Sequence, residues 1–388
     1  MRWLPTHVLR NFIMQIGPNR TNFPTFTQID EAEGDDALED LDKSSLEHVV
    51  EADPIVNEAD LSETKMANVA SGKKILDAIA SKLSPAAKSY WGNFFALQPS
   101  LNTRVMCGDA DGSYARLLMT GIAAGVIHFG ANGAEAEALL VDLLDLEQQM
   151  LSGSCVGLLD PSNTEKYEGL VKNLESKLEF RQGVQFGCIG DIAYDRLSGW
   201  LRPKLFDLIR NMKQNNDGVF IIGNHDMLQN ELPFQQVGDY KIMWGMNKSC
   251  SPEKLNLGGE YQQAIRSTFT ICHFDADRRQ FFVHTGLKKE LSPQGATYDA
   301  GILNNSEKFT VLATDGNMLA EAMNRAMLFP NFGIDTYFRP KDSETAQVAQ
   351  ELKMTVIKGH DGDSSQNACV VNINARAQKA FRPAVVTI

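Results

Sequence analysis

The sequence predicts an α/β fold in which parallel strands deliver polar side chains at their carboxyl ends. Short apolar runs, rich in β-branched and aromatic residues and without helical spacing, predict buried strands. Segments with apolar residues three and four positions apart predict helices. Five of the apolar runs end in Asp, Asn or His, and four of these polar residues follow a glycine. Because open α/β sheets bind ligands at the carboxyl ends of their strands, this pattern indicates a site there.

Length and composition limit the class of protein and its partners. With 388 residues and 43% hydrophobic residues, the chain can build one large domain with appendages, or two domains, around a full core. A net charge of −12 and a pI near 5.1 argue against a surface that wraps nucleic acid. No apolar run approaches the length that spans a membrane. The six cysteines form no CxxC pair, so we expect small apolar residues in a reducing compartment.

The N-terminal segment, residues 1–65, is expected to lie outside the main domain of residues 66–388. Residues 1–17 lack an uninterrupted apolar stretch and a cleavage signal, so we expect no signal peptide and a soluble protein of cytoplasmic type. Residues 28–63 are strongly acidic and poor in aromatic residues, which predicts a solvated tether or a partly helical arm.

Three later segments have helical spacing. Residues 73–83 predict a helix, and Pro85 then breaks it. Residues 134–150 and 164–180 predict two helices joined by a turn-rich connection, which together indicate a helical hairpin at about 131–182. Such a hairpin either docks a protein partner or decorates the surface, and both alternatives stay open.

A single polar strand end does not distinguish a ligand site from an ordinary turn. Residues 219–222 predict a short central strand, and Gly223, Asn224, His225 and Asp226 follow it. Asn, Asp and Gly are common in turns for purely local reasons, so this stretch alone indicates a turn. The other strand ends present Asp109, Asp191, His284 and His360. Five such ends in one chain are hard to attribute to turns alone.

Asp, Asn and His side chains in one site indicate divalent metal ions. Hard cations favour carboxylate and amide oxygens, and imidazole shifts the preference toward Mn, Fe or Zn. Two cations roughly 3.5–4 Å apart would bind a phosphoryl group, generate hydroxide at neutral pH and stabilise an in-line displacement. A carboxylate between the two cations would bridge them, and Asp191 is the most suitable candidate.

The ordered motifs resemble those of the calcineurin-like metallophosphoesterases. They are GDADG at residues 108–112, GD at 190–191 followed by Asp195-Arg196, GNHD at 223–226, His284, and GH at 359–360. The Asp195-Arg196 pair resembles the phosphoprotein phosphatase branch in particular. The match extends from about Val105 to the C-terminus. It implies an α/β sandwich of two mixed β-sheets flanked by helices, with the hairpin inserted. Residues 368–388 predict closing strands around a turn, which suits that architecture.

The resemblance also implies a set of metal ligands. Asp109 would bind the first metal ion, and Asp191 would bridge the pair. The second ion would be held by Asn224, His284 and His360. Two divalent ions are expected, with Mn as the preferred metal and Mg, Fe or Zn as alternatives.

Asp111 stands where the family usually has a histidine ligand. A carboxylate at this position would make the first metal site harder and more anionic, which favours Mn or Mg over Fe or Zn. Alternatively, Asp111 faces water and leaves a weaker site. A second departure lies between Asp191 and Asp195, where the chain has three residues and the branch has two, a difference that a loop bulge would absorb.

Four further residues are implied to act on the substrate. His225 would protonate the leaving-group oxygen, and Asp195 would orient His225 and favour its protonated form. Arg196 would hold the phosphate through its planar fork of donors. Lys358 lies near the position of another phosphate-contacting arginine of the branch and would supply a point charge. Ordinary surface cations remain the alternative for Arg196 and Lys358.

The implied function is metal-dependent hydrolysis of a phosphomonoester, most suitably on phospho-Ser/Thr or phospho-Tyr of a phosphoprotein. Hydroxide generated at the metal ions would attack phosphorus directly, without a covalent phosphoenzyme. The acidic arm and the hairpin fit a bacterial effector phosphatase that is secreted into a host cell. Two alternatives stay open: a dinucleoside-polyphosphate hydrolase, which shares these motifs, and an inactive binding module that keeps the fold.

Overall fold

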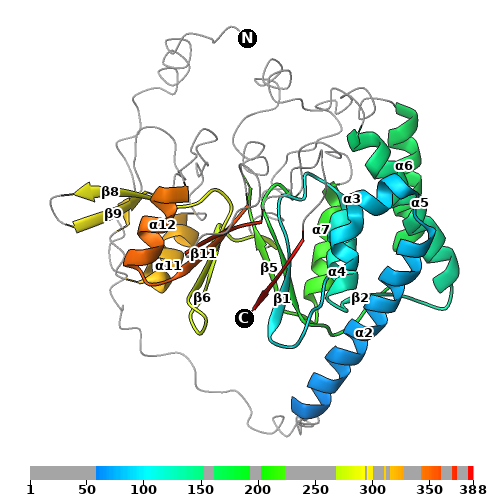
Figure 1. The fold of residues 1–388 in the computed structure, drawn as a ribbon, viewed down its shortest axis with the longest axis horizontal. Coiled ribbons are helices and arrows are strands. Elements are labelled where there is room, and N and C mark those ends of the chain that lie inside the picture. The colour runs from blue at the N-terminus through cyan, green and yellow to red at the C-terminus, as the bar shows by residue number, and fades with distance from the viewer. Residues whose placement is uncertain are drawn as a thin grey trace, which may run out of the picture. The chain divides into compact units, whose positions relative to one another are not determined.

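The computed structural model describes the parts of the chain that build the main domain. They are residues 58–152, 161–192, 202–223, 268–292, 295–299, 310–311, 315–326, 342–359, 369–373 and 383–387. The chain divides into two units, Met1–Ile55 and Val56–Ile388, and every described residue belongs to the second. This unit has a mixed α/β fold, as the sequence predicts (Figure 1). None of its described helices has both the length and the apolar character needed to cross a membrane.

The parallel strands of the first sheet end at a common edge. The strand order is β13 (Ala384–Thr387), β1 (Thr103–Cys107), β4 (Gln185–Ile189) and β5 (Gly218–Ile221). Strands β1, β4 and β5 run parallel, and β13 is antiparallel to β1. Cys107 pairs with Cys188, and Ile189 pairs with Ile221. Residues that follow these three strands therefore start side by side.

The second sheet has the same kind of common edge. Its strand order is β12 (Val370–Asn372), β11 (Thr355–Lys358), β7 (Gln280–Val283) and β6 (Cys272–Asp275). Strands β12, β11 and β7 run parallel, and β6 is antiparallel to β7. Lys358 pairs with both Val283 and Asn372, so these parallel strands end together. The closing strands expected in residues 368–388 are confirmed as β12 and β13, and they join different sheets.

A third, antiparallel sheet contains β10 (Thr310–Val311), β9 (Gly295–Asp299) and β8 (Lys288–Ser292). Its first strand in the chain, β8, follows β7 after a short connection. Helix α12 (Asp342–Glu351) contacts β8 as well as β11 and β12, and so links this sheet to the second one.

Apolar side chains from the two four-stranded sheets pack against one another. Met106, Ile189 and Ile221 of the first sheet lie in one buried cluster with Phe282 and Ile357 of the second. The apolar strand residues next to these belong to a larger cluster that also contains helix residues. Because successive side chains in a strand point to opposite faces, each sheet packs one face on the other sheet and one face on helices.

Each of the two four-stranded sheets is contacted by its own helices. Helices α4 (Tyr114–Ala123) and α7 (Arg202–Lys213) contact each other, and α4 packs on β1 and β4. Helix α11 (Gly316–Ala326) contacts β6 of the second sheet. Figure 1 shows α4 and α7 beside the first sheet, and α11 and α12 beside the second.

The helix predicted over residues 73–83 is longer than its periodicity indicates. Helix α2 spans Glu58–Lys82, and α3 follows at Pro85–Phe95 with Ser84 as its N-cap. Residues 58–63 of the acidic segment are thus helical, and the boundary expected between residues 65 and 66 falls within α2. The acidic residues of the first turn favour a helix start because they interact with the helix dipole.

The two helices expected to form the hairpin are present, but the second one is shorter than expected. Helix α5 (Gly133–Ser152) contacts α6 (Pro161–Glu175). The expectation of helix to residue 180 is wrong at its end, because β3 (Leu178–Phe180) pairs antiparallel with β2 (Ile127–Phe129). A strand of three residues contains too little alternation to be recognised in the sequence.

The described cysteines behave as the composition predicts. Cys107, Cys188 and Cys272 are buried, and Cys369 is half-buried. The sulfur atoms of Cys107 and Cys188 lie 3.7 Å apart on neighbouring strands. These thiols pack as small apolar side chains, which confirms the expectation for them.

Candidate metal centre

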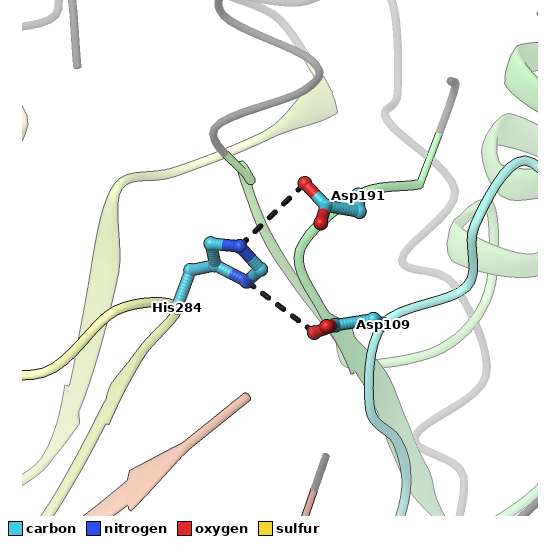
Figure 2. Close-up of side chains that lie close together, drawn as sticks. All are labelled: Asp109, Asp191 and His284. Carbon is cyan, nitrogen blue, oxygen red and sulfur yellow. Dashed lines mark ion pairs between the residues drawn. The ribbon is translucent and has the colours of Figure 1, made fainter. Parts of the chain in front are cut away.

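Three of the predicted ligands come together where strands of both sheets end. Asp109 follows β1, Asp191 follows β4, and His284 follows β7. Their ligand atoms lie within 4.8 Å of one another, and the three side chains are buried. Figure 2 shows the imidazole of His284 between the two carboxylates. We call Asp109, Asp191 and His284 the metal cluster.

The distances in the metal cluster place one imidazole nitrogen near each carboxylate. His284 Nδ1 lies 3.6 Å from Asp109 Oδ1, and His284 Nε2 lies 3.5 Å from Asp191 Oδ1. His284 Nδ1 also lies 3.2 Å from the carbonyl oxygen of Ile189, at the end of β4. Two carboxylates and an imidazole form a donor set that suits a divalent cation such as Mn²⁺, Fe²⁺ or Zn²⁺. The three residues therefore fit a metal ion.

The backbone at Gly190 makes room for the cluster. Gly190 has φ +86°, and a Cβ atom at this position would overlap the imidazole of His284. The next residue, Asp191, has φ +50°, an uncommon conformation for a residue other than glycine. The carbonyls of Gly190 and Asp191 accept hydrogen bonds of 3.2 Å from the amides of Ala110 and Gly112. The two aspartate loops thus hold each other in place.

Two further strand ends reach the metal cluster. A Cβ atom at Gly223, after β5, would overlap Asp191, and one at Gly359, after β11, would lie 2.7 Å from Asp109 Oδ1. The sequence continues with Asn224 after Gly223 and with His360 after Gly359. Both of these predicted ligands lie outside the described residues, as do the predicted catalytic residues Asp195, Arg196 and His225. Their roles stay predictions.

Asp111 and Lys358 are described, and each has a partner of opposite charge. Asp111 Oδ2 accepts a hydrogen bond of 2.6 Å from Arg116 Nη1. The buried ammonium group of Lys358 lies 2.8 Å from Asp342 Oδ1 at the start of α12. Asp111 as a metal ligand and Lys358 as a phosphate contact stay predictions.

A second buried charged group, not predicted from the sequence, lies next to the metal cluster. We call it the arginine cluster; it consists of Arg116, Asp111 and Glu147 with the hydroxyl residues Tyr90, Ser113 and Tyr167. Arg116 and Glu147 are fully buried. Arg116 is the one charged residue of helix α4, in which all ten residues are buried. Arginine is seldom buried unless it is paired, so a single charged residue in an otherwise apolar helix indicates a buried ion pair.

Burial raises the pKa of the acidic groups in the arginine cluster, and the positive charge of Arg116 lowers it. Burial raises the pKa of Glu147, although Arg116 and the hydroxyl groups of Ser113 and Tyr167 favour its ionised form. Burial also raises the pKa of Tyr90 to about 12, against the attraction of the neighbouring Arg116. The phenol of Tyr90 therefore stays neutral at physiological pH.

No protein-family model matches the sequence, and no curated protein matches it. Among solved structures, the chain is similar to a cold-active protein-tyrosine phosphatase of a psychrophilic Shewanella species, with 13% identity and a TM-score of 0.37 over 78% of this chain and 80% of that chain. A second structure of a cold-active protein tyrosine phosphatase gives 13% identity and a TM-score of 0.36 over 78% of each chain. Similarity at this level does not assign the chain to a family.

Proposed function

We propose that the protein is a metal-dependent phosphomonoesterase of the calcineurin-like type that acts on phosphoproteins. The main support is the metal cluster, in which Asp109, Asp191 and His284 meet at strand ends of two packed sheets. These residues are far apart in the sequence, and ordinary turns would not require their side chains to converge. The two-sheet arrangement with outer helices is consistent with the sandwich that the sequence motifs imply.

We assign the metal-binding role first to the three residues of the metal cluster. Asn224 and His360 complete the proposed set, because the glycines that precede them lie against Asp191 and Asp109. Bound divalent ions, with Mn²⁺ as the first choice, would supply Lewis-acid chemistry and lower the pKa of water. The burial of the cluster excludes most of the solvent that would otherwise weaken its electrostatic interactions.

The proposed work on the substrate belongs to the residues of the GNHD and DR motifs. His225 donates a proton to the leaving-group oxygen, and Asp195 orients its ring. Arg196 binds the phosphate oxygens through two parallel N–H donors. A phosphoprotein is the proposed substrate, and the α5–α6 hairpin is the proposed docking element for it.

The test compares two leaving groups in protein that has been stripped of metal and reloaded with Mn²⁺, Mg²⁺ or Zn²⁺. We expect turnover of an aryl phosphate only with metal, and a loss of roughly 100-fold or more in His225→Ala. The loss should be larger for a phosphoserine peptide than for the aryl phosphate, because an alkoxide needs the proton more than a phenoxide does. His273→Ala, a change of a half-buried histidine in β6, is the matched control.

Absence of turnover with every metal, in folded protein, would contradict the proposal and favour a binding module. Preference for dinucleoside polyphosphates over phosphopeptides would keep the metal chemistry and replace the substrate class. Equal losses with both leaving groups in His225→Ala would remove the assignment of His225 as the proton donor.

A further inference from the structure

We infer that Arg116 is a positioning residue that fixes the metal-binding loop of residues 109–111 and connects it to the α5–α6 hairpin. The inference rests on the proposed metal site and goes beyond it, since it concerns residues that do not touch substrate. Arg116 lies in the first turn of α4, directly after the loop that contains Asp109. Its side chain is fully buried.

One guanidinium nitrogen of Arg116 binds the loop at two points. Arg116 Nη1 donates to the carbonyl oxygen of Asp109 at 2.8 Å and to Asp111 Oδ2 at 2.6 Å. Asp111 has φ +51°, which is unfavourable for a residue with a side chain. The charge-assisted bond from Arg116 offsets that cost and sets the direction in which the chain leaves Asp109. In the structure, the carboxylate of Asp111 is thus a hydrogen-bond partner of Arg116.

Arg116 is itself held by two other helices. Its Nη2 atom donates to the hydroxyl of Tyr90 in α3 at 2.8 Å, and its Nε atom lies 3.7 Å from Glu147 Oε1 in α5. A guanidinium group that is fixed on several sides cannot follow the loop if the loop moves. The loop is therefore tied to the surrounding helices through one side chain.

Glu147 extends this connection to the second helix of the hairpin. Its carboxylate accepts a hydrogen bond of 2.7 Å from the hydroxyl of Ser113 and one of 2.9 Å from the hydroxyl of Tyr167 in α6. Ser113 Oγ in turn accepts from the amide of Arg116 at 3.0 Å, and so caps α4. The contacts run without a gap from α6 through α5 to the loop that presents Asp109. The hairpin is therefore connected to the proposed metal site through Glu147 and Arg116.

The expected consequence is a change in metal affinity. Partners that orient metal ligands from outside typically contribute 10–100-fold in affinity. Arg116→Lys keeps the charge but cannot reach Asp109, Asp111 and Tyr90 together, because an ammonium group has no fork of donors. We expect it to weaken Mn²⁺ binding by roughly 10-fold or more, and excess Mn²⁺ should restore most of the lost turnover.

Arg104→Lys is the matched control. Arg104 is also a buried arginine, but it lies at the start of β1, at the opposite end of that strand from Asp109. Its guanidinium group donates to Gln185 and packs over the ring of Phe282. The same substitution there should leave the Mn²⁺ dissociation constant within about two-fold of wild type, even if it lowers thermal stability.

The experiment is isothermal titration of metal-stripped full-length protein with Mn²⁺, with thermal unfolding as a second measurement. The inference is overturned if Arg116→Lys binds Mn²⁺ like wild type, or if both lysine variants lose affinity equally. If Arg116→Lys does not fold, Tyr90→Phe removes only a hydroxyl that Arg116 contacts and should lower affinity in the same direction; unchanged affinity there also overturns the inference.

The outcome separates this inference from the proposed function. Wild-type protein that binds Mn²⁺ but hydrolyses no phosphate ester, together with weakened binding in Arg116→Lys, overturns the function and supports the positioning role. Metal-dependent hydrolysis by wild type, together with unchanged Mn²⁺ affinity in Arg116→Lys, supports the function and overturns the positioning role. Wild-type protein that binds no metal overturns both.

Discussion

The metal cluster and the arginine cluster meet at the loop of residues 109–111, which contributes Asp109 to the first and Asp111 to the second, and they differ in the source of their positive charge. Both bury two carboxylates, Asp109 and Asp191 in one and Asp111 and Glu147 in the other. In the arginine cluster, Arg116 supplies a cation that does not depend on pH. In the metal cluster, the positive charge available from the three residues is that of His284, which exists only when the imidazole is protonated. The arginine cluster thus contains its own cation, whereas the metal cluster is the proposed receptor for one.

This difference predicts opposite effects on stability and binding. Buried charges cost several kcal/mol each unless partners compensate for them. Removing the fixed cation of the arginine cluster should therefore destabilise the protein. Removing one carboxylate of the metal cluster should relieve repulsion in metal-free protein while it strongly weakens metal binding, since functional sites often reduce stability.

The largest expected effect is that of Arg116→Met. The variant leaves Asp111 and Glu147 buried without their guanidinium partner, and we expect the free energy of unfolding of metal-free protein to fall by about 3–5 kcal/mol. Urea unfolding measures the loss. Asp191→Asn is the comparison, with unchanged or higher stability but Mn²⁺ affinity at least about 100-fold weaker. Similar loss of stability in the two variants would show that the two clusters do not differ in this way.

A smaller effect is expected at Gly190, where the backbone makes room for His284. In Gly190→Ala the new Cβ would overlap the imidazole, in a left-handed backbone conformation, and we expect a loss of about 3 kcal/mol with weaker Mn²⁺ binding. Gly169→Ala in the exposed face of α6 is the control and should gain roughly 0.5–1 kcal/mol. If Gly190→Ala binds Mn²⁺ as wild type does, the close packing of Gly190 on His284 is not needed for the site.

The sequence predicts the metal cluster better than the arginine cluster for a physical reason. Asp109 and Asp191 each follow a glycine at the end of an apolar run, and strand ends of a parallel sheet share an edge whatever their distance in the chain. His284 follows a strand of the other sheet, so its place depends on how the two sheets pack. The motif order predicted that meeting, and the structure shows these three side chains together.

The arginine cluster was missed because it depends on helix packing. Arg116 meets Tyr90 and Glu147 only after α3 and α5 pack around α4, and no local pattern specifies that arrangement. The spacing of apolar residues predicted α5 and most of α6, but it does not tell which polar residue faces inward. The short strands β2 and β3 were missed for a related reason, since their pairing is formed across the hairpin and is too brief to leave a pattern.

The smallest expected effect concerns Tyr90, the residue of the arginine cluster whose phenol can ionise at high pH. Tyr90→Phe removes the hydroxyl that accepts from Arg116, and at neutral pH we expect a loss of about 2 kcal/mol in the free energy of unfolding. Burial raises the pKa of Tyr90 from 10.0 to about 12 in the folded state, so the folded state favours the neutral phenol. The stability that Tyr90 contributes is thus complete below pH 10 and is lost as pH rises toward 12. Urea unfolding of both proteins from pH 8 to 12 should show the advantage of wild type shrinking over that window, whereas a constant difference would mean that Tyr90 titrates alike in the folded and unfolded states.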